Sequence, residues 1–450
     1  MSVVAHARLR RGACPGLSAP MATGDGFLAR LMPTGTVALD AMAGLVAAAQ
    51  KFGNGIIEIT SRGSVQVRGL SEDSAKDFAD AVARLAIAAH DGVPVIADPL
   101  AGLDPAELID AGALAAELRH QLVMRGLVPR IHVLARRKDV DGRDIGERSD
   151  AVLRTAMPGH DGIPGHDGMK VLSPKVSVAI DGGGALHLDT LSADIRLRAV
   201  ATPGGPRLQV AIGGDAAHAP SLGSIGPADA VDAVLSLLEQ IAALGPEARA
   251  RDLLRAAGMR ATALPRGTAE PIGAHPLRGG ALARGIGFAF GHADADTLTR
   301  LIEAAGAVGA SGLRTAPGRA LLLLGLKPDD DDAFTASAAR LGFITDPHDP
   351  RRRVVACAGA PVCASGEIAA RALAPQIAEQ VAPLLAADEV IHLSGCPKGC
   401  AHQGAAALTA IGRDGACDLL ARGAPAGRCA TESLPQRLAA LAAQRRARHG

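Results

Sequence analysis

The alternation of apolar and polar residues between positions 24 and 70 predicts a compact β-α-β-β unit. A turn beginning at Pro33 separates the first strand from the helix, and Ser61-Arg62-Gly63 joins the last two strands. The predicted elements are a strand at 26–32, a helix at 39–51, and strands at 55–60 and 64–70. This order with short connections is typical of half of a ferredoxin-like layer.

A second copy of the same pattern occurs downstream. Its elements are a strand at 285–291, a helix at 294–306, and a strand pair within 311–326. Both copies place an arginine at the end of the first strand of the pair, Arg62 and Arg314. The match in element order and spacing indicates an internal duplication.

An α/β segment follows each copy, and a stretch rich in glycine and proline, 264–276, separates the two halves. The predicted fold class is therefore mixed α+β and α/β, internally duplicated, with two ferredoxin-like half-domains and two α/β domains. The predicted boundaries are 1–70 for the N-terminal segment and first ferredoxin-like half, 71–264 for the first α/β domain, 265–326 for the linker and second half, and 327–450 for the second α/β domain.

Composition and charge exclude several classes of partner. Lysine and arginine number 47 against 46 acidic residues, so the net charge of +1 favours neither nucleic acid nor an anionic membrane. The chain has no tryptophan or tyrosine and 7 phenylalanines, which leaves few aromatic platforms for stacking bases. Apolar runs such as 320–326 are far shorter than a membrane helix. Arg8, Arg10 and Arg11 precede no apolar run, so we expect no signal peptide and a cytoplasmic protein.

Two cysteine pairs in the last hundred residues form the strongest chemical motif. They read C-x5-C and C-x3-C, separated by 32 residues, and comprise Cys357, Cys363, Cys396 and Cys400. Four thiolates suit a [4Fe-4S] cluster, in which each iron needs one terminal thiolate. Tetrahedral zinc and unligated core cysteines are the alternatives, although the first spacing is wide for zinc. A disulfide framework is less favoured for a chain in a reducing compartment.

The remaining cysteines, Cys14, Cys417 and Cys429, show no pairing pattern and are interpreted as apolar fillers. His402 follows Cys400 by two residues, which suggests a place beside the cluster. Where the second half carries Cys357 and Cys363, the first half reads ADPLAGLDPAE and has Asp98 and Pro99 instead of thiols. We therefore expect metal chemistry in the second half and a binding scaffold in the first.

A tandem repeat, PGHDGIPGHDG, offers a further set of metal-binding side chains: His160, Asp161, His166 and Asp167. A duplicated loop without a metal is the preferred interpretation. No Gly-x-Gly-x-x-Gly motif opens a βαβ unit, and the glycines at 182–184 are not followed by the helix that a nicotinamide site needs.

The cysteine spacing and the duplicated architecture resemble the sulfite and nitrite reductase superfamily over nearly the whole chain. Within it, the segments 10–26, 174–198 and 394–402 resemble the precorrin-3B synthase family. The resemblance implies an iron–sulfur cluster in the second α/β domain, a mononuclear non-haem iron whose ligands the sequence does not identify, and NADH as electron source through a partner reductase.

The sequence departs from the reductases where they grip a small anion above sirohaem iron. At those positions it has Leu31, Val93, Lys175 and Ser177, so only one cation is kept. Without charge-assisted hydrogen bonds nothing offsets the desolvation of sulfite. A bulky polycarboxylate tetrapyrrole is a better candidate for that cavity, and arginine forks suit its carboxylates. The candidate substrate-binding residues are Arg62, Arg68, Lys175, Arg284 and Arg314.

The resemblance thus implies an oxygen-dependent monooxygenase of aerobic cobalamin biosynthesis. Its reaction takes precorrin-3A, O2 and reducing equivalents, hydroxylates the C-20 carbon and closes a γ-lactone. The alternatives are a sirohaem-dependent sulfite or nitrite reductase and, in another class, a non-catalytic iron–sulfur electron carrier. Bound sirohaem would favour the first of these.

Overall fold

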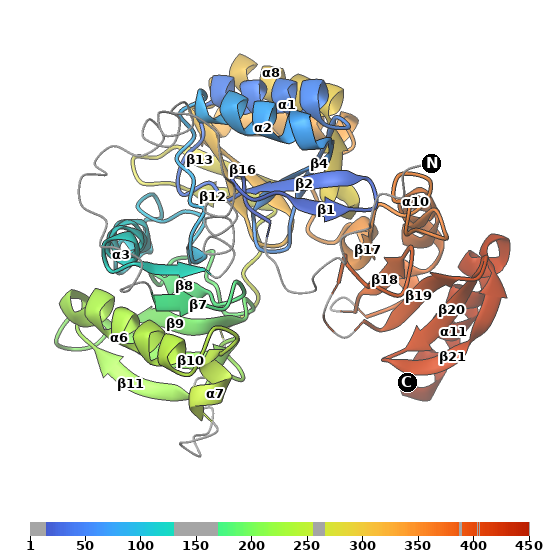
Figure 1. The fold of residues 1–450 in the computed structure, drawn as a ribbon. Helices are drawn as coiled ribbons and strands as arrows, with labels where there is room; N and C mark the ends of the chain where they lie inside the picture. The colour runs from blue at the N-terminus through green and yellow to red at the C-terminus, as the bar shows by residue number, and fades with distance from the viewer. Residues whose placement is uncertain are drawn as a thin grey trace, which may run out of the picture.

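The computed structural model describes residues 15–129, 170–254, 266–386, 389–402, 404 and 406–449. Cys14 and the PGHDG repeat lie outside the described residues. Figure 1 shows two ferredoxin-like halves stacked at the top, with the first α/β unit (green) and the second (red) below them on opposite sides. Within the described part of the chain, no helix is both long and apolar enough to cross a membrane.

The first ferredoxin-like half has the predicted elements and two additions. Its elements are β1 (Met21–Thr23), β2 (Gly26–Leu31), α1 (Leu39–Phe52), β3 (Ile56–Ile59), β4 (Val65–Leu70) and α2 (Glu72–Ala83). The β2–β4–β3 core is antiparallel, and β1 extends it as a hairpin partner of β2. Ser71 caps α2 through a reciprocal hydrogen bond with Ser74, which explains where that helix begins.

The second half repeats this plan and confirms the predicted duplication. Its elements are β12 (Gly273–Pro276), β13 (Leu282–Gly287), β14 (His292–Asp294), α8 (Ala295–Ala307), β15 (Gly312–Ala316), β16 (Ala320–Leu326) and α9 (Asp331–Arg340). Its sheet has the order β12-β13-β16-β15, equivalent to β1-β2-β4-β3 in the first half.

Each ferredoxin-like half contributes a short segment that pairs with the edge strand of the other half. Strand β14 pairs with β3, while Val37, the equivalent position of the first half, bridges Leu313 of β15. The two hairpin turns also touch, since the Gly318 N–H donates to the carbonyl of Ser61 at 3.0 Å. One apolar core lies between the paired sheets and helices α1, α2, α8 and α9, and it includes Phe78 and Phe334. The core therefore includes α2 and α9, two helices that the predicted boundaries after residues 70 and 326 assign to the α/β segments.

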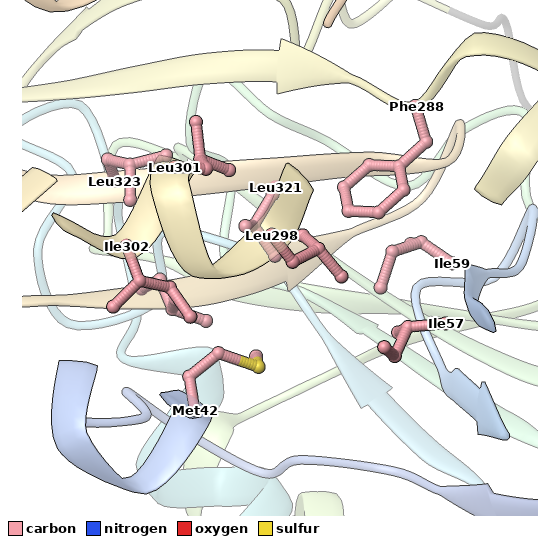
Figure 2. Close-up of a pocket in the computed structure, with 10 residues that line it drawn as sticks. Met42, Ile57, Ile59, Phe288, Leu298, Leu301, Ile302, Leu321 and Leu323 are labelled. Atoms are coloured by element: carbon pink, nitrogen blue, oxygen red, sulfur yellow. The ribbon is translucent and has the colours of Figure 1, made fainter. Parts of the chain in front are cut away.

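Figure 2 shows a cavity inside this core, between α1, α8 and the sheets. Its lining is apolar throughout and comprises Met42, Ile57, Ile59, Phe288, Leu298, Leu301, Ile302, Leu313, Leu321 and Leu323. Because none of these side chains offers a polar or charged group, the cavity is unsuited to a polycarboxylate ligand.

The two α/β units have the same sheet topology. In the first, the elements are β5 (Val95–Ala97), α3 (Ala111–Met124), β6 (Leu127–Pro129), β7 (Lys170–Leu172), β8 (Val178–Asp181), β9 (Ala193–Val200), β10 (Arg207–Gly214), β11 (Ser221–Ile225), α6 (Ala230–Ala243) and α7 (Ala250–Leu254). In the second they are β17 (Val354–Ala356), α10 (Ala370–Gln380), β18 (Ile391–Ser394), β19 (Leu408–Arg413), β20 (Ala416–Ala421), β21 (Ala424–Ala430) and α11 (Leu434–His449).

Each of these sheets begins with three parallel strands and ends with two antiparallel ones, in the orders β5-β8-β9-β10-β11 and β17-β18-β19-β20-β21. Strands β6 and β7 form a separate parallel pair. Short 3₁₀ turns complete the described elements: η2 (Pro227–Asp229), η3 (Ala289–Gly291), η4 (Pro328–Asp330), η5 (Pro350–Arg353), η6 (Ala382–Leu384) and η7 (Thr431–Ser433).

Candidate active site

The four cysteines of the paired motif lie at the carboxyl edge of the second α/β sheet. Cys357 follows β17 directly, and Cys396 lies two residues beyond the end of the neighbouring parallel strand β18. Cys363 and Cys400 belong to the loops that leave these strands. The carboxyl ends of parallel strands meet at one edge, so two cysteine pairs whose nearest members are 33 residues apart in sequence are brought to one place.

Backbone geometry around Cys357 is that of a ligand loop. The Gly395 N–H donates to Cys357 Sγ at 3.0 Å, and the Cys363 N–H donates to the carbonyl of Gly359 at 2.8 Å. Gly359 has a φ of 65°, and a Cβ there would lie 2.5 Å from the backbone nitrogen of Ala370. Only glycine fits such a turn, which explains why the motif contains it.

The cysteine sulfurs are close electrostatic neighbours. Burial raises the pKa of the Cys357 and Cys400 thiols, and nearby cysteines, Cys396 in both cases, raise them further, while the Gly395 N–H lowers that of Cys357.

Cys417 and Cys429 lie elsewhere, on the neighbouring strands β20 and β21. The register of these strands places the two cysteines opposite each other, a pairing that their sequence spacing does not reveal. Cys417 is fully buried in the apolar core of the domain, and both are free thiols. Their interpretation as apolar fillers agrees with this packing.

The turn between β1 and β2 contacts the loop that carries Cys363. The carbonyl of Gly24 accepts a hydrogen bond of 2.9 Å from the Ala364 N–H. A Cβ on Gly24 would lie 2.5 Å from Cys363 Sγ. Sequence reasoning did not assign Gly24 to the site, although it belongs to one of the segments that carry the family resemblance. The contact joins the first ferredoxin-like half to the cysteine site.

A polar row crosses the first ferredoxin-like sheet on the face opposite its core. Arg30, Gln66, Glu58 and His292 occupy one register on β2, β4, β3 and β14. With its amide oriented to satisfy both neighbours, Gln66 accepts from Arg30 Nη2 at 2.7 Å and donates to Glu58 Oε2 at 3.2 Å. Their neighbours in sequence, such as Ile57 and Val65, point into the core, as strand alternation requires.

Glu58 connects this row to the cysteine domain. It accepts hydrogen bonds from Arg68 Nε at 3.1 Å and from Arg371 Nη2, on α10, at 2.5 Å. Burial tends to raise the pKa of Glu58, but the two arginines hold it below its usual value. Arg68 also pairs with Asp25 at 3.1 Å, and it lies close enough to Cys400 to lower that thiol's pKa. The candidate Arg68 therefore lies near the cysteine loop, within a buried network.

Sequence reasoning did not single out Arg371 and Arg319. Burial lowers the pKa of Arg319, which Glu58 opposes, and its side chain packs against Gly291. We call the set Arg30, Arg68, Arg319 and Arg371 with Asp25 and Glu58 the cationic face. Asp25 and Glu58 pair with Arg68 and Arg371 in this set, and Arg68 is the member that acts on the Cys400 thiol.

Arg62 and Arg314 join the ferredoxin-like halves to the first α/β unit. Arg62 donates to the carbonyl of Ser192 at 2.9 Å and to Ser177 Oγ at 3.4 Å. Arg314 donates to Thr36 Oγ1 at 2.9 Å and to the carbonyl of Ala101 at 2.8 Å. Both guanidinium groups lie at a domain junction.

The expected symmetry of these two arginines is not observed. Arg62 lies in the turn between β3 and β4, whereas Arg314 lies within β15, and Arg319 occupies the equivalent turn. Arg284 forms a buried ion pair with Asp331 at the start of α9. Lys175 is exposed in a turn three residues before β8 and does not open that strand as predicted, because β8 begins at Val178.

Three of the four positions expected to grip an anion in the reductases are buried or contact protein here, whereas the fourth, Lys175, is exposed. Leu31 and Val93 belong to apolar cores with 6% and 2% exposure, and Ser177 contacts Arg62. None of these three side chains carries a positive charge.

Two histidines lie near the second cysteine pair, His392 on β18 and His402 two residues after Cys400. The rings of His392 and His402 are 5.7 Å apart in an edge-to-face arrangement. His392 is 6% exposed, and its Nε2 has no hydrogen-bond partner among the described residues. Burial, with smaller effects of His402 and Arg319, lowers the pKa of His392 to about 4.

Comparison with known proteins agrees with this architecture. Residues 19–85 match the nitrite/sulfite reductase ferredoxin-like half domain. The chain is 36% identical over 431 residues to precorrin-3B synthase of Sinorhizobium sp., covering 94% of this chain and 85% of that protein. Sulfite reductase [ferredoxin] 2 of Mycolicibacterium paratuberculosis is 29% identical over 139 residues, or 29% of this chain and 25% of that one. The solved structure of the NirA protein of Mycobacterium tuberculosis superimposes with a TM-score of 0.62 at 17% identity, covering 91% and 79% of the two chains.

Proposed function

Because the chain belongs to the precorrin-3B synthase family, we propose that it converts precorrin-3A to precorrin-3B with O2 and reducing equivalents. The carrying observation is the cationic face, a set of four arginines in which Arg68 lies beside the motif cysteines. A polycarboxylate tetrapyrrole needs cationic partners when it leaves water, and arginine forks bind carboxylates bidentately. A non-catalytic electron carrier would not need that charge.

We propose Cys357, Cys363, Cys396 and Cys400 as ligands of a [4Fe-4S] cluster. The Gly395 N–H to Cys357 Sγ hydrogen bond and the mutual electrostatic effects of the cysteines support this assignment. When bound, such a cluster supplies single electrons. Ground-state O2 needs electrons, together with a metal or flavin, before it can attack closed-shell carbon. The electrons would derive from NADH through a partner reductase, and the cytoplasm is the compartment that suits this chemistry.

In this proposal the protein's own residues bind and orient the macrocycle. Arg68 and Arg371 are fixed by their shared contact with Glu58, so their forks are held in place before substrate arrives. Arg62, Arg314 and Lys175 would take further carboxylates at the junction with the first α/β unit. Arg284 forms an ion pair with Asp331, and we propose that it helps to pack α9 and does not bind substrate.

A sirohaem-dependent sulfite reductase is the second candidate, supported by the shared fold and the partial match to a sulfite reductase. Leu31, Val93 and Ser177 oppose it, because two of them are apolar and buried and the third contacts Arg62. Sulfite would be desolvated there without compensation.

The test is turnover with labelled O2. Protein reconstituted anaerobically would receive precorrin-3A, reductant and ¹⁸O2, and mass spectrometry should find one labelled atom in the new hydroxyl group and none in the lactone ring. Label arriving from water would refute the monooxygenase. Conversion of sulfite to sulfide at about 1 per second or faster would favour the reductase instead.

The substrate site is tested by binding. Arg314→Gln and Arg62→Gln should weaken tetrapyrrole binding by about 1.5–3 kcal/mol each, the value of a charge-assisted contact. The matched control is Arg207→Gln, which removes an exposed arginine that bonds Ser224 at the far edge of the first α/β sheet. Equal binding by all the variants would refute this placement of the pocket without affecting the reaction assignment.

A further inference from the structure

The turn between β15 and β16 places an arginine in a backbone conformation that favours glycine. Arg319 has a φ of 62°, whereas the equivalent residue of the first half is a glycine, Gly63, with a φ of 80°. Each of the two stands six positions before a glycine of positive φ in the following strand, Gly325 or Gly69. Because a side chain strains the left-handed region that glycine enters freely, the second half holds a strained residue where the first half does not.

The strained turn lies against the cysteine domain. The Arg319 carbonyl accepts a hydrogen bond of 3.0 Å from the Phe288 N–H. The Arg319 side chain passes Gly291 so closely that a Cβ on this glycine would lie 2.8 Å from Arg319 Cδ. Phe290 also has a positive φ, 59°, and it packs against the apolar core of the cysteine domain, as Cys357 does. These contacts hold the Arg319 guanidinium at the junction between the second half and the cysteine domain.

The guanidinium of Arg319 is partly buried and lacks an anion of its own. Among the described residues, its side chain makes no hydrogen bond or ion pair. Burial lowers the pKa of Arg319, and Glu58 opposes this change from a distance. Glu58 already accepts hydrogen bonds from Arg68 and Arg371. A guanidinium that loses water on burial without gaining an anion is destabilised, so Arg319 has unused capacity for a carboxylate.

Two buried nitrogen atoms near Arg319 also lack hydrogen-bond partners within the described part of the chain. They are His392 Nε2 and Arg371 Nε. Burial and His402 lower the pKa of His392, and Arg319 is close enough to lower it further. Arg371 and Arg319 are both neighbours of Glu58. An Arg Nε–H can only donate and a histidine Nε2 can donate, so the three side chains offer donors to one anion.

We propose that Arg319, with Arg371 Nε and His392 Nε2 beside it, binds one carboxylate of the tetrapyrrole and thereby fixes which edge of the macrocycle faces the cysteines. This inference rests on the proposed function, from which it takes the class of ligand. A tetrapyrrole carries similar carboxylate side chains around its ring, and Gly63 offers no counterpart in the first half. A charge present on one side only therefore distinguishes one orientation from the others. The strained turn holds the guanidinium in place before the ligand arrives, which reduces the entropy lost on binding.

The experiment measures binding of uroporphyrin, an air-stable octacarboxylate tetrapyrrole, to the full-length, cluster-loaded protein through the porphyrin fluorescence. Arg319→Gly should weaken binding about tenfold or more, the effect of losing a charge-assisted contact. Because glycine relieves the left-handed strain, the same variant should unfold at the temperature of the wild type or above it. Weaker binding without loss of stability separates a ligand contact from a structural role.

Arg422→Gly is the matched control. Arg422 also has a positive φ, 49°, in the turn between β20 and β21, and its side chain is 69% exposed beside Glu389. The substitution removes the same side chain from the same backbone region and should leave the uroporphyrin affinity unchanged. Arg319→Asn provides the result if Arg319→Gly does not fold, because asparagine also tolerates the left-handed region.

Unchanged uroporphyrin affinity in Arg319→Gly would overturn this inference and leave the proposed reaction unaffected. No binding by the wild type up to about 100 μM uroporphyrin would overturn the inference together with the substrate class. Arg319-dependent binding without turnover of precorrin-3A would support the inference and overturn only the proposed reaction. If acetate at about 10 mM raised the unfolding temperature of the wild type as much as uroporphyrin does, but not that of Arg319→Gly, the site would take any small carboxylate and the macrocycle assignment would be wrong.

Discussion

Replacing Gly24 with alanine should disrupt the cysteine site without removing a ligand. Gly24 lies in the β1–β2 turn, more than 330 residues before the loop that it contacts. A Cβ there would lie 2.5 Å from Cys363 Sγ and 3.0 and 3.1 Å from the backbone nitrogens of Ala364 and Ser365. Since non-bonded atoms are comfortable at about 3.5–4.0 Å, the turn or the loop must move by roughly 1 Å.

That displacement is large for a metal ligand, because bond lengths at metal sites tolerate only about 0.2 Å. The neighbouring backbone nitrogens cannot rotate away as a side chain could, so overpacking should also destabilise the contact by about 1–3 kcal/mol. We therefore expect Gly24→Ala to hold less iron and sulfide per chain after reconstitution. The cluster that does form should decay faster in air.

The assay is iron and acid-labile sulfide per chain, with the decay of the cluster absorbance after exposure to air. Gly35→Ala is the matched control, because the same methyl group there meets no atom within 4 Å. If Gly24→Ala retained a full cluster with the decay rate of Gly35→Ala, the turn would not constrain Cys363 and this account of the site would be wrong.

Three further predictions follow from the same contacts. Replacing any one motif cysteine with serine should lower the amount of bound iron and sulfide. Cys417→Ser should not, because Cys417 lies in the apolar core of the domain. A complete cluster after loss of Cys363 would contradict the ligand assignment. Glu58→Gln should lower the free energy of unfolding, measured in denaturant, by about 3 kcal/mol because Arg68 and Arg371 lose a shared buried anion. Glu72 is exposed, so Glu72→Gln should not have this effect. The folded-state pKa of His392 is depressed to about 4, whereas the imidazole of the unfolded chain has its ordinary pKa of 6.5. As pH falls from roughly 7 to 5, the unfolded chain therefore binds a proton on this imidazole that the folded chain does not. The free energy of unfolding should drop by about 2 kcal/mol over that range. His392→Asn should flatten that part of the pH profile, and an unaltered profile would show that other groups cause it.

Local sequence pattern determined the elements of the two ferredoxin-like halves. The alternation in 55–60 and 64–70 predicted β3 and β4 because one face of that sheet packs on a core and the other is polar. The repeat of that pattern revealed the duplication, which the matching sheet orders confirm. The cysteine spacing predicted a ligand set, and both pairs lie in glycine-containing loops that follow buried strands. These features depend on residues near one another in the chain.

Tertiary structure decided which charges serve a site. Arg284 and Arg68 look alike in sequence, yet one is paired with Asp331 beside α9 and the other belongs to the cationic face. Arg371 meets Glu58 across 313 positions, and Asp98 meets Gly182 across 84. Hydrophobic periodicity specifies which side of an element is buried, but it carries no information about which distant element packs against it. The partners of a charged side chain, and hence its role, are set only when the halves and the α/β units come together.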